Sequence, residues 1–211
     1  MILLLPVVCL FACSLHIALE SQQHALASKT KLLASLAFVG FAWEMGAMHS
    51  TYGQIVFIAL LWSLIGDVLL ALKNRKQSFL FGIGAFLLAH VCYALAFIQA
   101  GFNGSQLPII LPIIMAILFI IGLWLRKHLS GLFSLAVPAY LIVIAVMLVF
   151  AWTNQSPTAG WWIISGATLF AFSDLWVARN RFIHSSIINR IIGLPSYYIA
   201  QLILAYSVSL V

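Results

Sequence analysis

The sequence predicts an all-α integral membrane protein with eight transmembrane helices, and three observations carry that prediction. The 211 residues are 64% apolar and only 7% charged, whereas a soluble domain carries about 25% charged residues. The apolar residues form eight runs, each close to the roughly 20 residues that span hydrocarbon. All ten Lys and Arg residues lie in or beside alternate connections between these runs.

The eight runs fill almost the whole chain. They cover residues 2–19, 31–48, 54–72, 78–99, 107–125, 131–152, 160–178 and 190–210. No stretch is left for an extramembrane domain, so we expect one integral membrane domain over residues 1–211. The three Cys residues also fall inside apolar runs. That placement predicts small packing residues rather than disulfides or a zinc site.

The basic residues predict the orientation in the membrane. They are Lys29, Lys31, Lys73, Arg75, Lys76, Arg126, Lys127, Arg179, Arg181 and Arg190. The positive-inside rule places their connections in the cytoplasm and both termini outside. Orientation therefore accounts for the net charge of +6, and no nucleic-acid partner is implied. A bacterial inner membrane and an endoplasmic reticulum membrane both obey this rule; we expect a bacterial inner membrane.

Two of the four acidic residues, Asp67 and Asp174, lie inside apolar runs at matching places. The first basic residue follows six positions after Asp67 and five after Asp174. A carboxylate at the centre of a membrane helix costs about 3 kcal/mol on insertion scales and usually faces a protein interior. Because the third and seventh runs cross in the same direction, the two acids should lie at equal depth. They predict one shared polar site near the cytoplasmic surface.

The spacing of these acids indicates an internal repeat. Asp67 and Asp174 are separated by half the length of the chain, and an Asn-Arg pair follows each of them. His90 follows Asp67 at the same spacing at which Tyr197 follows Asp174. We expect a parallel repeat of four plus four helices, with the aspartates facing each other where the halves meet.

Two carboxyl groups in one buried site favour a state in which one is protonated and the other ionised. Such a pair can act as general acid and general base in one reaction. The alternative is that each aspartate forms a structural salt bridge with a nearby Arg, such as Arg75 or Arg181. Glu44 lies near the outer end of the second run, and we expect it to be structural.

Other polar residues lie in the later runs. His90 falls about 18 Å from the cytoplasmic end of its run at about 1.5 Å per residue, roughly two turns deeper than the acids. It could line the bottom of a cavity or bond a neighbouring helix. Tyr197 and Gln201 share a helix face, while Tyr198 points elsewhere. We find no metal-ligand spacing, serine-nucleophile elbow or phosphate loop, so neither a metal nor a cofactor is predicted.

Three motifs resemble the signatures of the YhhN-type lysoplasmalogenase family, which are transmembrane alkenyl ether hydrolases. The first is Gly66-Asp67 followed by Phe79-x-x-Gly82-x-x-Ala85-Phe86-x-x-x-His90-x-x-Tyr93-Ala94-x-Ala96-Phe97. The second is Gly166-x-x-x-Phe170-x-x-Ser173-Asp174-x-x-x-Ala178-x-x-Arg181-Phe182, and the third is Tyr197-Tyr198-x-Ala200-Gln201. Two departures are Leu32-Leu33 after Lys31, where a proline is expected, and Ser196 in place of a threonine.

The resemblance implies hydrolysis of the vinyl ether bond of a lysoplasmalogen lipid substrate. The products would be a fatty aldehyde and a glycerophospho-base carrying ethanolamine or choline. Asp67 and Asp174 would be catalytic, although the sequence does not say which is the acid. The substrate would be bound by His90, Tyr93, Tyr197, Tyr198, Gln201, Lys73, Arg75 and Arg181.

A proton-coupled transporter of small molecules or lipids is the alternative function. Intramembrane acids and repeated halves fit that class as well. Helices broken beside the aspartates would favour it, but the candidate breakers Pro6 and Pro112 lie near the ends of their runs. The oligomeric state is not predicted by any helix face.

Overall fold

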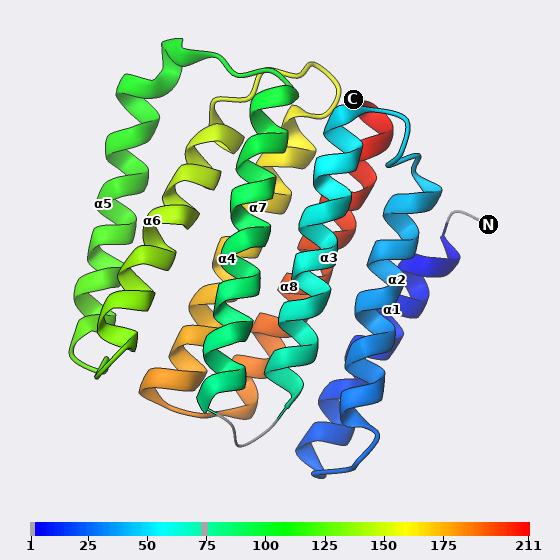
Figure 1. Ribbon diagram of the computed structural model, residues 1–211, viewed down its shortest axis with the longest axis vertical. Coiled ribbons are helices and arrows are strands. Elements are labelled where there is room, and N and C mark those ends of the chain that lie inside the picture. The colour runs from blue at the N-terminus through cyan, green and yellow to red at the C-terminus, as the bar shows by residue number, and fades with distance from the viewer. Residues whose placement is uncertain (1–2, 73–75) are drawn as a thin grey trace.

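The computed structural model describes residues 3–72 and 76–211 and is helical throughout, without strands in the described part (Figure 1). The α-helices are α1 (Leu4–Ser21), α2 (Ala27–Glu44), α3 (Thr51–Ala71), α4 (Lys76–Gln99), α5 (Leu107–Arg126), α6 (Phe133–Trp152), α7 (Gly160–Ala178) and α8 (Ile187–Ser207). Each predicted run corresponds to one of these helices, which confirms the all-α prediction.

Helix α2 is where the predicted boundaries were furthest from the structure. It begins at Ala27 and ends at Glu44, whereas the sequence predicted 31–48. The prediction omitted the polar first turn, and it continued past Gly46, whose φ of 84° ends the helix in a turn. Within the described residues seven helices are long and apolar enough to cross a membrane. The remaining one, α2, carries Lys29 and Lys31 near its start.

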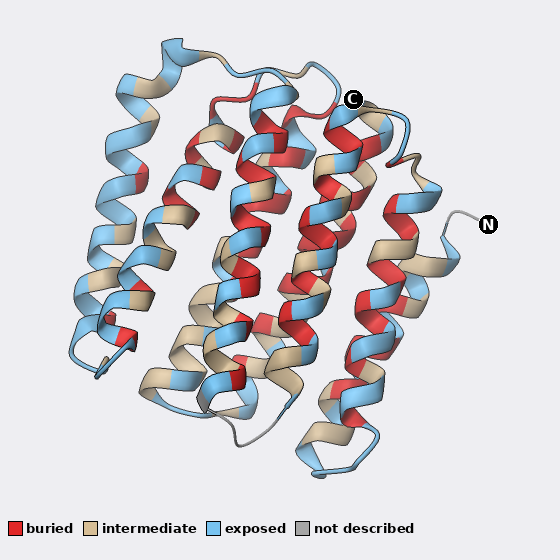
Figure 2. Ribbon diagram, in the orientation of Figure 1, coloured by how far each residue is buried: buried red, intermediate tan, exposed pale blue. Residues whose placement is uncertain are grey.

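The helices run up and down in sequence, so alternate connections share one end of the molecule (Figure 1). Helices α1 and α2, α3 and α4, and α7 and α8 form closely packed pairs. Helix α8 also contacts α1, α2 and α3, while α4 packs against α6. Helix α5 lies at one edge against α6, and most of its surface is exposed (Figure 2).

The buried core consists mainly of aromatic and small side chains at helix contacts. Phe38, Tyr93, Phe97, Phe170 and Tyr198 are almost completely buried. Large apolar side chains elsewhere point outward, including Leu135, Phe119 and Trp161. Exposed apolar surface on this scale indicates contact with lipid, which agrees with an integral membrane protein.

Asp67 and Asp174 occupy the same position in their helices. Asp67 lies four residues before the end of α3 at Ala71, and Asp174 lies four residues before the end of α7 at Ala178. A π-helix, η2 (Arg179–Ile183), continues directly from α7. Single π-helical turns are frequent at functional sites; this one extends the helix below Asp174 and leads into α8.

Candidate active site

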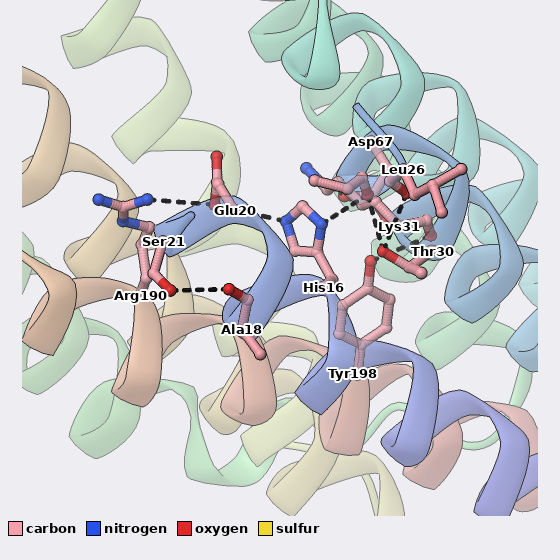
Figure 3. A network of polar contacts seen from close by, with 11 residues as sticks. His16, Ala18, Glu20, Ser21, Leu26, Thr30, Lys31, Asp67, Arg190 and Tyr198 are labelled. Carbon is pink, nitrogen blue, oxygen red and sulfur yellow. Dashed lines mark hydrogen bonds and ion pairs between the residues drawn. The ribbon is translucent and has the colours of Figure 1, made fainter. Parts of the chain in front are cut away.

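Asp67 is a buried carboxylate whose two oxygens both have partners. The Lys31 Nζ atom lies 3.1 Å from its Oδ1. The hydroxyl groups of Ser35 and Tyr197 each donate a hydrogen bond to Oδ2 over 2.7 Å. Helices α2 and α8 therefore supply one cation and two donors to an acid on α3. Figure 3 shows Lys31 beside Asp67.

These partners favour the ionised form of Asp67. The Asp67 and Lys31 side chains are 3% and 9% exposed, and two buried opposite charges stabilise one another only while both remain charged. Hydrogen bonds donated to a carboxylate stabilise its charge further. The surroundings of Asp67 thus stabilise a negative charge on it.

Asp174 has different partners and no Lys or Arg ion pair among the described residues. The Tyr140 hydroxyl donates to its Oδ2 over 2.9 Å, and the His90 Nε2 atom lies 3.2 Å from the same oxygen. That nitrogen lacks the alignment of a regular hydrogen bond. The Asp174 side chain is 15% exposed, whereas His90 is completely buried.

The other His90 nitrogen fixes where a proton lies. His90 Nδ1 is 2.6 Å from the Phe86 carbonyl oxygen, which can only accept, so Nδ1 carries a hydrogen. In neutral His90 the Nε2 atom then has a lone pair and lies beside the Asp174 carboxyl group. Two lone pairs in contact repel each other, so this contact suits a proton on one of the two groups. Asp174 is therefore arranged as a proton carrier.

The Phe170 ring packs between a partner of Asp174 and a partner of Asp67. Its ring centroid is 4.4 Å from that of His90 and 5.5 Å from that of Tyr197. Phe86 also contacts Tyr197, at 5.7 Å between centroids. Aromatic packing of this kind restricts ring orientation, so the partners of both aspartates are fixed by one cluster.

One expectation from the sequence needs correction. His90 was placed two turns deeper than the acids, but it contacts Asp174. The reason is that η2 prolongs α7, so Asp174 lies nine residues before the end of the helical segment at Ile183. Of the Arg residues named in the alternative of structural salt bridges, Arg75 falls outside the described residues, and the Arg181 guanidinium lies 4.2 Å from the ring centroid of Phe79.

One cavity brings both aspartates to a common space. Asp67, Asp174, Lys31, Tyr140 and Tyr197 line it. Apart from Ser173, the rest of its wall is apolar and comes largely from α5, α6 and α7, including Leu118, Ile121, Leu141, Ile144 and Leu175. Two acids with different partners thus border a mostly apolar space.

A second, polar chamber adjoins this cavity at the end of the molecule that carries the basic connections. Lys31, Leu70 and Phe79 line both spaces. The chamber is the larger one, at about 460 Å³ against about 110 Å³. Its polar wall consists of His16, Glu20, Gln23, His24, Ser28, Asn180, Arg181, Asn189 and Arg190.

The remaining residues suggested by the sequence lie away from both spaces or outside the described residues. The Tyr93 hydroxyl donates to Gln201 Oε1 over 2.5 Å, and the Tyr198 hydroxyl bonds the Lys31 carbonyl oxygen over 3.4 Å. All three side chains are fully buried and line neither space. Lys73 and Arg75 fall in the segment that the structure does not describe.

Sequence reasoning did not identify Lys31, Ser35 and Tyr140 as site residues. Lys31 was interpreted as one of the basic residues that set the orientation in the membrane. Ser35 precedes Asp67 by 32 residues and Tyr140 precedes Asp174 by 34. Aligning the two halves on their aspartates would have placed these hydroxyl residues at nearly equivalent positions.

Comparison with known sequences establishes the family. The profile of the YhhN family matches residues 26–208. The chain belongs to the YhhN family. Both aspartates and all their partners named above lie within the matched range, so the site belongs to the part of the chain that the family shares. Glu20 and His16 of the polar chamber precede it.

Several YhhN relatives carry a functional name. Lysoplasmalogenase TMEM86B of Sus scrofa is 32% identical over 204 residues, covering 94% of this chain and 84% of that protein. The human protein of the same name is 33% identical, covering 89% and 77%. A lysoplasmalogenase of Mycobacterium tuberculosis is 32% identical over 155 residues, covering 69% and 57%. No solved structure matches the chain significantly.

Proposed function

We propose that this YhhN-family protein is a lysoplasmalogenase, which hydrolyses the vinyl ether bond of a lysoplasmalogen to a fatty aldehyde and a glycerophospho-base. Relatives with that name match most of the chain. The observation that carries the proposal is that Asp67, paired with Lys31, and Asp174, in contact with His90, line one cavity. Vinyl ether hydrolysis needs both an acid and an anion.

The order of the two spaces supports this substrate. A lysoplasmalogen has a polar headgroup, then a glycerol carrying the vinyl ether, then a long apolar chain. The protein offers the polar chamber, then the junction at Lys31 beside Asp67, then an apolar cavity. A lipid bound lengthwise would bring its vinyl ether next to the acids.

In the proposed reaction, Asp174 donates its proton to the β-carbon of the vinyl ether. This produces an oxocarbenium cation on the carbon bonded to oxygen. Asp67 stabilises that cation electrostatically and accepts a proton from the water molecule that attacks it. The resulting hemiacetal breaks its bond to glycerol, releasing the aldehyde and a glycerol hydroxyl. One water is consumed, and its protons restore Asp174 and complete the hydroxyl group.

The partners of each acid support this division of roles. Lys31, Ser35 and Tyr197 stabilise a negative charge on Asp67, which makes it a poor proton donor. His90 shares a proton with Asp174 and can return one after each turnover. We propose that Tyr93, Tyr198 and Gln201 position α2, α4 and α8 around this centre and that Arg181 lies near the headgroup.

At the level of the fold, we propose that α2 is the eighth membrane span, because it packs along α1, α3 and α8. A four-plus-four repeat is supported by crossed contacts between the halves. Asp67 on α3 binds Tyr197 on α8, and Asp174 on α7 contacts His90 on α4. We further propose one domain over residues 1–211 in a bacterial inner membrane, with cytoplasmic basic loops and both termini outside.

The test is aldehyde release from lysoplasmenylethanolamine by detergent-purified protein. The wild type should release aldehyde, while Asp67→Asn and Asp174→Asn should reduce kcat by at least about 100-fold. Glu44→Gln is the matched control, because Glu44 is exposed at the far end of α2, and it should retain wild-type activity. A wild type that releases no aldehyde would exclude this function. Aldehyde release at the wild-type rate by either Asn variant would remove that aspartate from the mechanism.

A further inference from the structure

We propose that the polar chamber is a recognition site for a zwitterionic headgroup, in which Arg190 binds the phosphate and Glu20 binds the cationic amine. This inference rests on the proposed function and adds to it the residues that recognise the headgroup. They lie on α1, α7, η2 and α8, apart from the aspartates.

The chamber has the charge arrangement that a phosphate requires. The guanidinium groups of Arg181 and Arg190 belong to its wall, and Lys31 lies at its junction with the reaction cavity. Arginine suits phosphate because its planar fork donates two parallel hydrogen bonds. Arg190 is in the first turn of α8, where the helix dipole also favours an anion.

Two donors in this wall are buried but lack an acceptor within the described part of the protein. They are Arg190 Nε and Trp176 Nε1, and both residues line the chamber. Buried donors without a partner are rare, since each costs a lost hydrogen bond. Phosphodiester oxygens accept hydrogen bonds and carry charge, so a phosphate placed in the chamber would satisfy such donors.

Glu20 supplies the opposite charge. It is the one acid that lines the chamber among the described residues. One of its carboxylate oxygens, Oε2, lies 3.4 Å from Arg190 Nη1 and 3.5 Å from His16 Nε2, and Figure 3 shows Glu20 between these two side chains. A guanidinium next to a carboxylate matches the phosphate next to an ammonium in a phosphoethanolamine or phosphocholine group.

The recognition site is separate from the reaction centre. Glu20 and His16 precede the family match at residues 26–208, whereas Arg190 and the aspartates lie inside it. The cavity that the aspartates line includes neither Glu20 nor Arg190. The chamber can thus set headgroup preference without altering the reaction centre. The adjoining cavity keeps Asp67 in contact with Lys31, which borders both spaces.

The experiment uses three substrates with the same alkenyl chain. Lysoplasmenylethanolamine carries phosphate and amine, its glycerol-headgroup analogue carries phosphate alone, and 1-alkenylglycerol carries neither. Purified wild type, Glu20→Gln and Arg190→Met are compared by kcat/KM for aldehyde release. Arg126→Met is the matched control, since Arg126 is exposed at the end of α5 and lines neither space.

Arg190→Met should lower kcat/KM for both phosphate-bearing substrates by about 10- to 100-fold, the effect of losing a charge-assisted hydrogen bond. It should leave 1-alkenylglycerol unchanged. Glu20→Gln should lower only the value for the ethanolamine substrate. Ratios between substrates within one preparation do not depend on the fraction of folded protein, so partial misfolding cannot imitate this pattern.

The inference is overturned if active wild type, Glu20→Gln and Arg190→Met all show the same ratios between the three substrates. It is also overturned if Arg126→Met reproduces the loss. Should Arg190→Met be inactive on every substrate, Arg190→Lys replaces it and should retain a preference for phosphate-bearing substrates over 1-alkenylglycerol. Wild-type protein inactive on all three substrates would instead refute the proposed function, on which this inference depends.

Discussion

The ion pair between Lys31 and Asp67 is the most sensitive single contact of the site. Both side chains are almost fully buried, and removing one partner of a buried pair leaves an uncompensated charge at a cost of about 3–5 kcal/mol. We expect Lys31→Met to lower thermal stability in detergent and to reduce kcat strongly, because the Asp67 carboxylate would lose the cation that balances its charge. Thermal unfolding and aldehyde release measure the two effects.

A double variant separates stability from chemistry at this pair. Lys31→Met combined with Asp67→Asn removes both charges, so much of the lost stability should return, whereas activity should not. The expected coupling between the two substitutions is positive for unfolding. If the double variant instead lost as much stability as the two single variants added together, the two side chains would not interact.

Tyr197 contributes through one hydroxyl group. It donates to Asp67 Oδ2 over 2.7 Å, while its ring is held by Phe86 and Phe170. Tyr197→Phe should keep the ring packing and lower kcat about tenfold or more, the usual effect of removing a hydrogen bond to a charged group. Tyr206→Phe is the control, because this α8 tyrosine packs on Trp162 away from the cavity. Equal rates for the two variants would contradict the role given to Tyr197.

At the scale of single residues, the sequence singled out Asp67 and Asp174 as site residues but did not predict their different partners. Asp67 and Asp174 stand out because a carboxylate inside an apolar run is costly. Their partners are ordinary residues such as Ser35 and Tyr140, which cost little wherever they lie. Which of them contacts which acid depends on helix packing, and so does the assignment of acid and base.

At the scale of the helix, contact between α3 and α4 places Asp67. A Cβ atom added at Gly66 would lie 2.6 Å from Phe86 Cε2, and that ring is enclosed by Tyr197 and Phe170. Gly66→Ala should therefore separate the helices, cost about 1–3 kcal/mol by overpacking, and reduce activity by displacing Asp67. Thermal unfolding and aldehyde release are the measurements.

Gly84→Ala provides the comparison on the same pair of helices. Nothing lies within 4 Å of a Cβ atom at Gly84, and alanine favours a helix over glycine by about 1 kcal/mol. This variant should be at least as stable as the wild type and fully active. If both alanine variants behaved alike, the close contact at Gly66 would not be what positions α3.

The positions of the helices were predictable because each apolar run is long enough to span the membrane as a helix. The exceptions occur where polar residues continue a helix, as in the first turn of α2 and in η2 after α7. Apolar length contains no signal for such continuations. The π-helix changed the relative depth of Asp174 and His90, so the contact between them was missed.

At the scale of the whole molecule, two halves combine to form each acid site. Asp67 uses Tyr197 from the second half, and Asp174 uses His90 from the first. The tyrosine and the histidine each follow the aspartate of their own half at the same spacing. Neither half could build its site alone. The sequence predicted that the halves meet at the acids, but crossed pairing requires α4 and α8 to reach the opposite half, which only the packing reveals.

The direction of the molecule in the membrane decides which leaflet supplies its substrate. The polar chamber opens at the end that carries the basic connections, where the positive-inside rule expects the cytoplasm. Ser130 is exposed in one of those connections, and Ser105 is exposed at the opposite end. In intact bacterial cells a membrane-impermeant maleimide should label Ser105→Cys, while Ser130→Cys should react only after permeabilisation.

The native Cys9, Cys13 and Cys92 lie within helices, the first two buried, so an unsubstituted control should remain unlabelled. Labelling of Ser130→Cys in intact cells would reverse the orientation and would make the outer leaflet the source of the lipid.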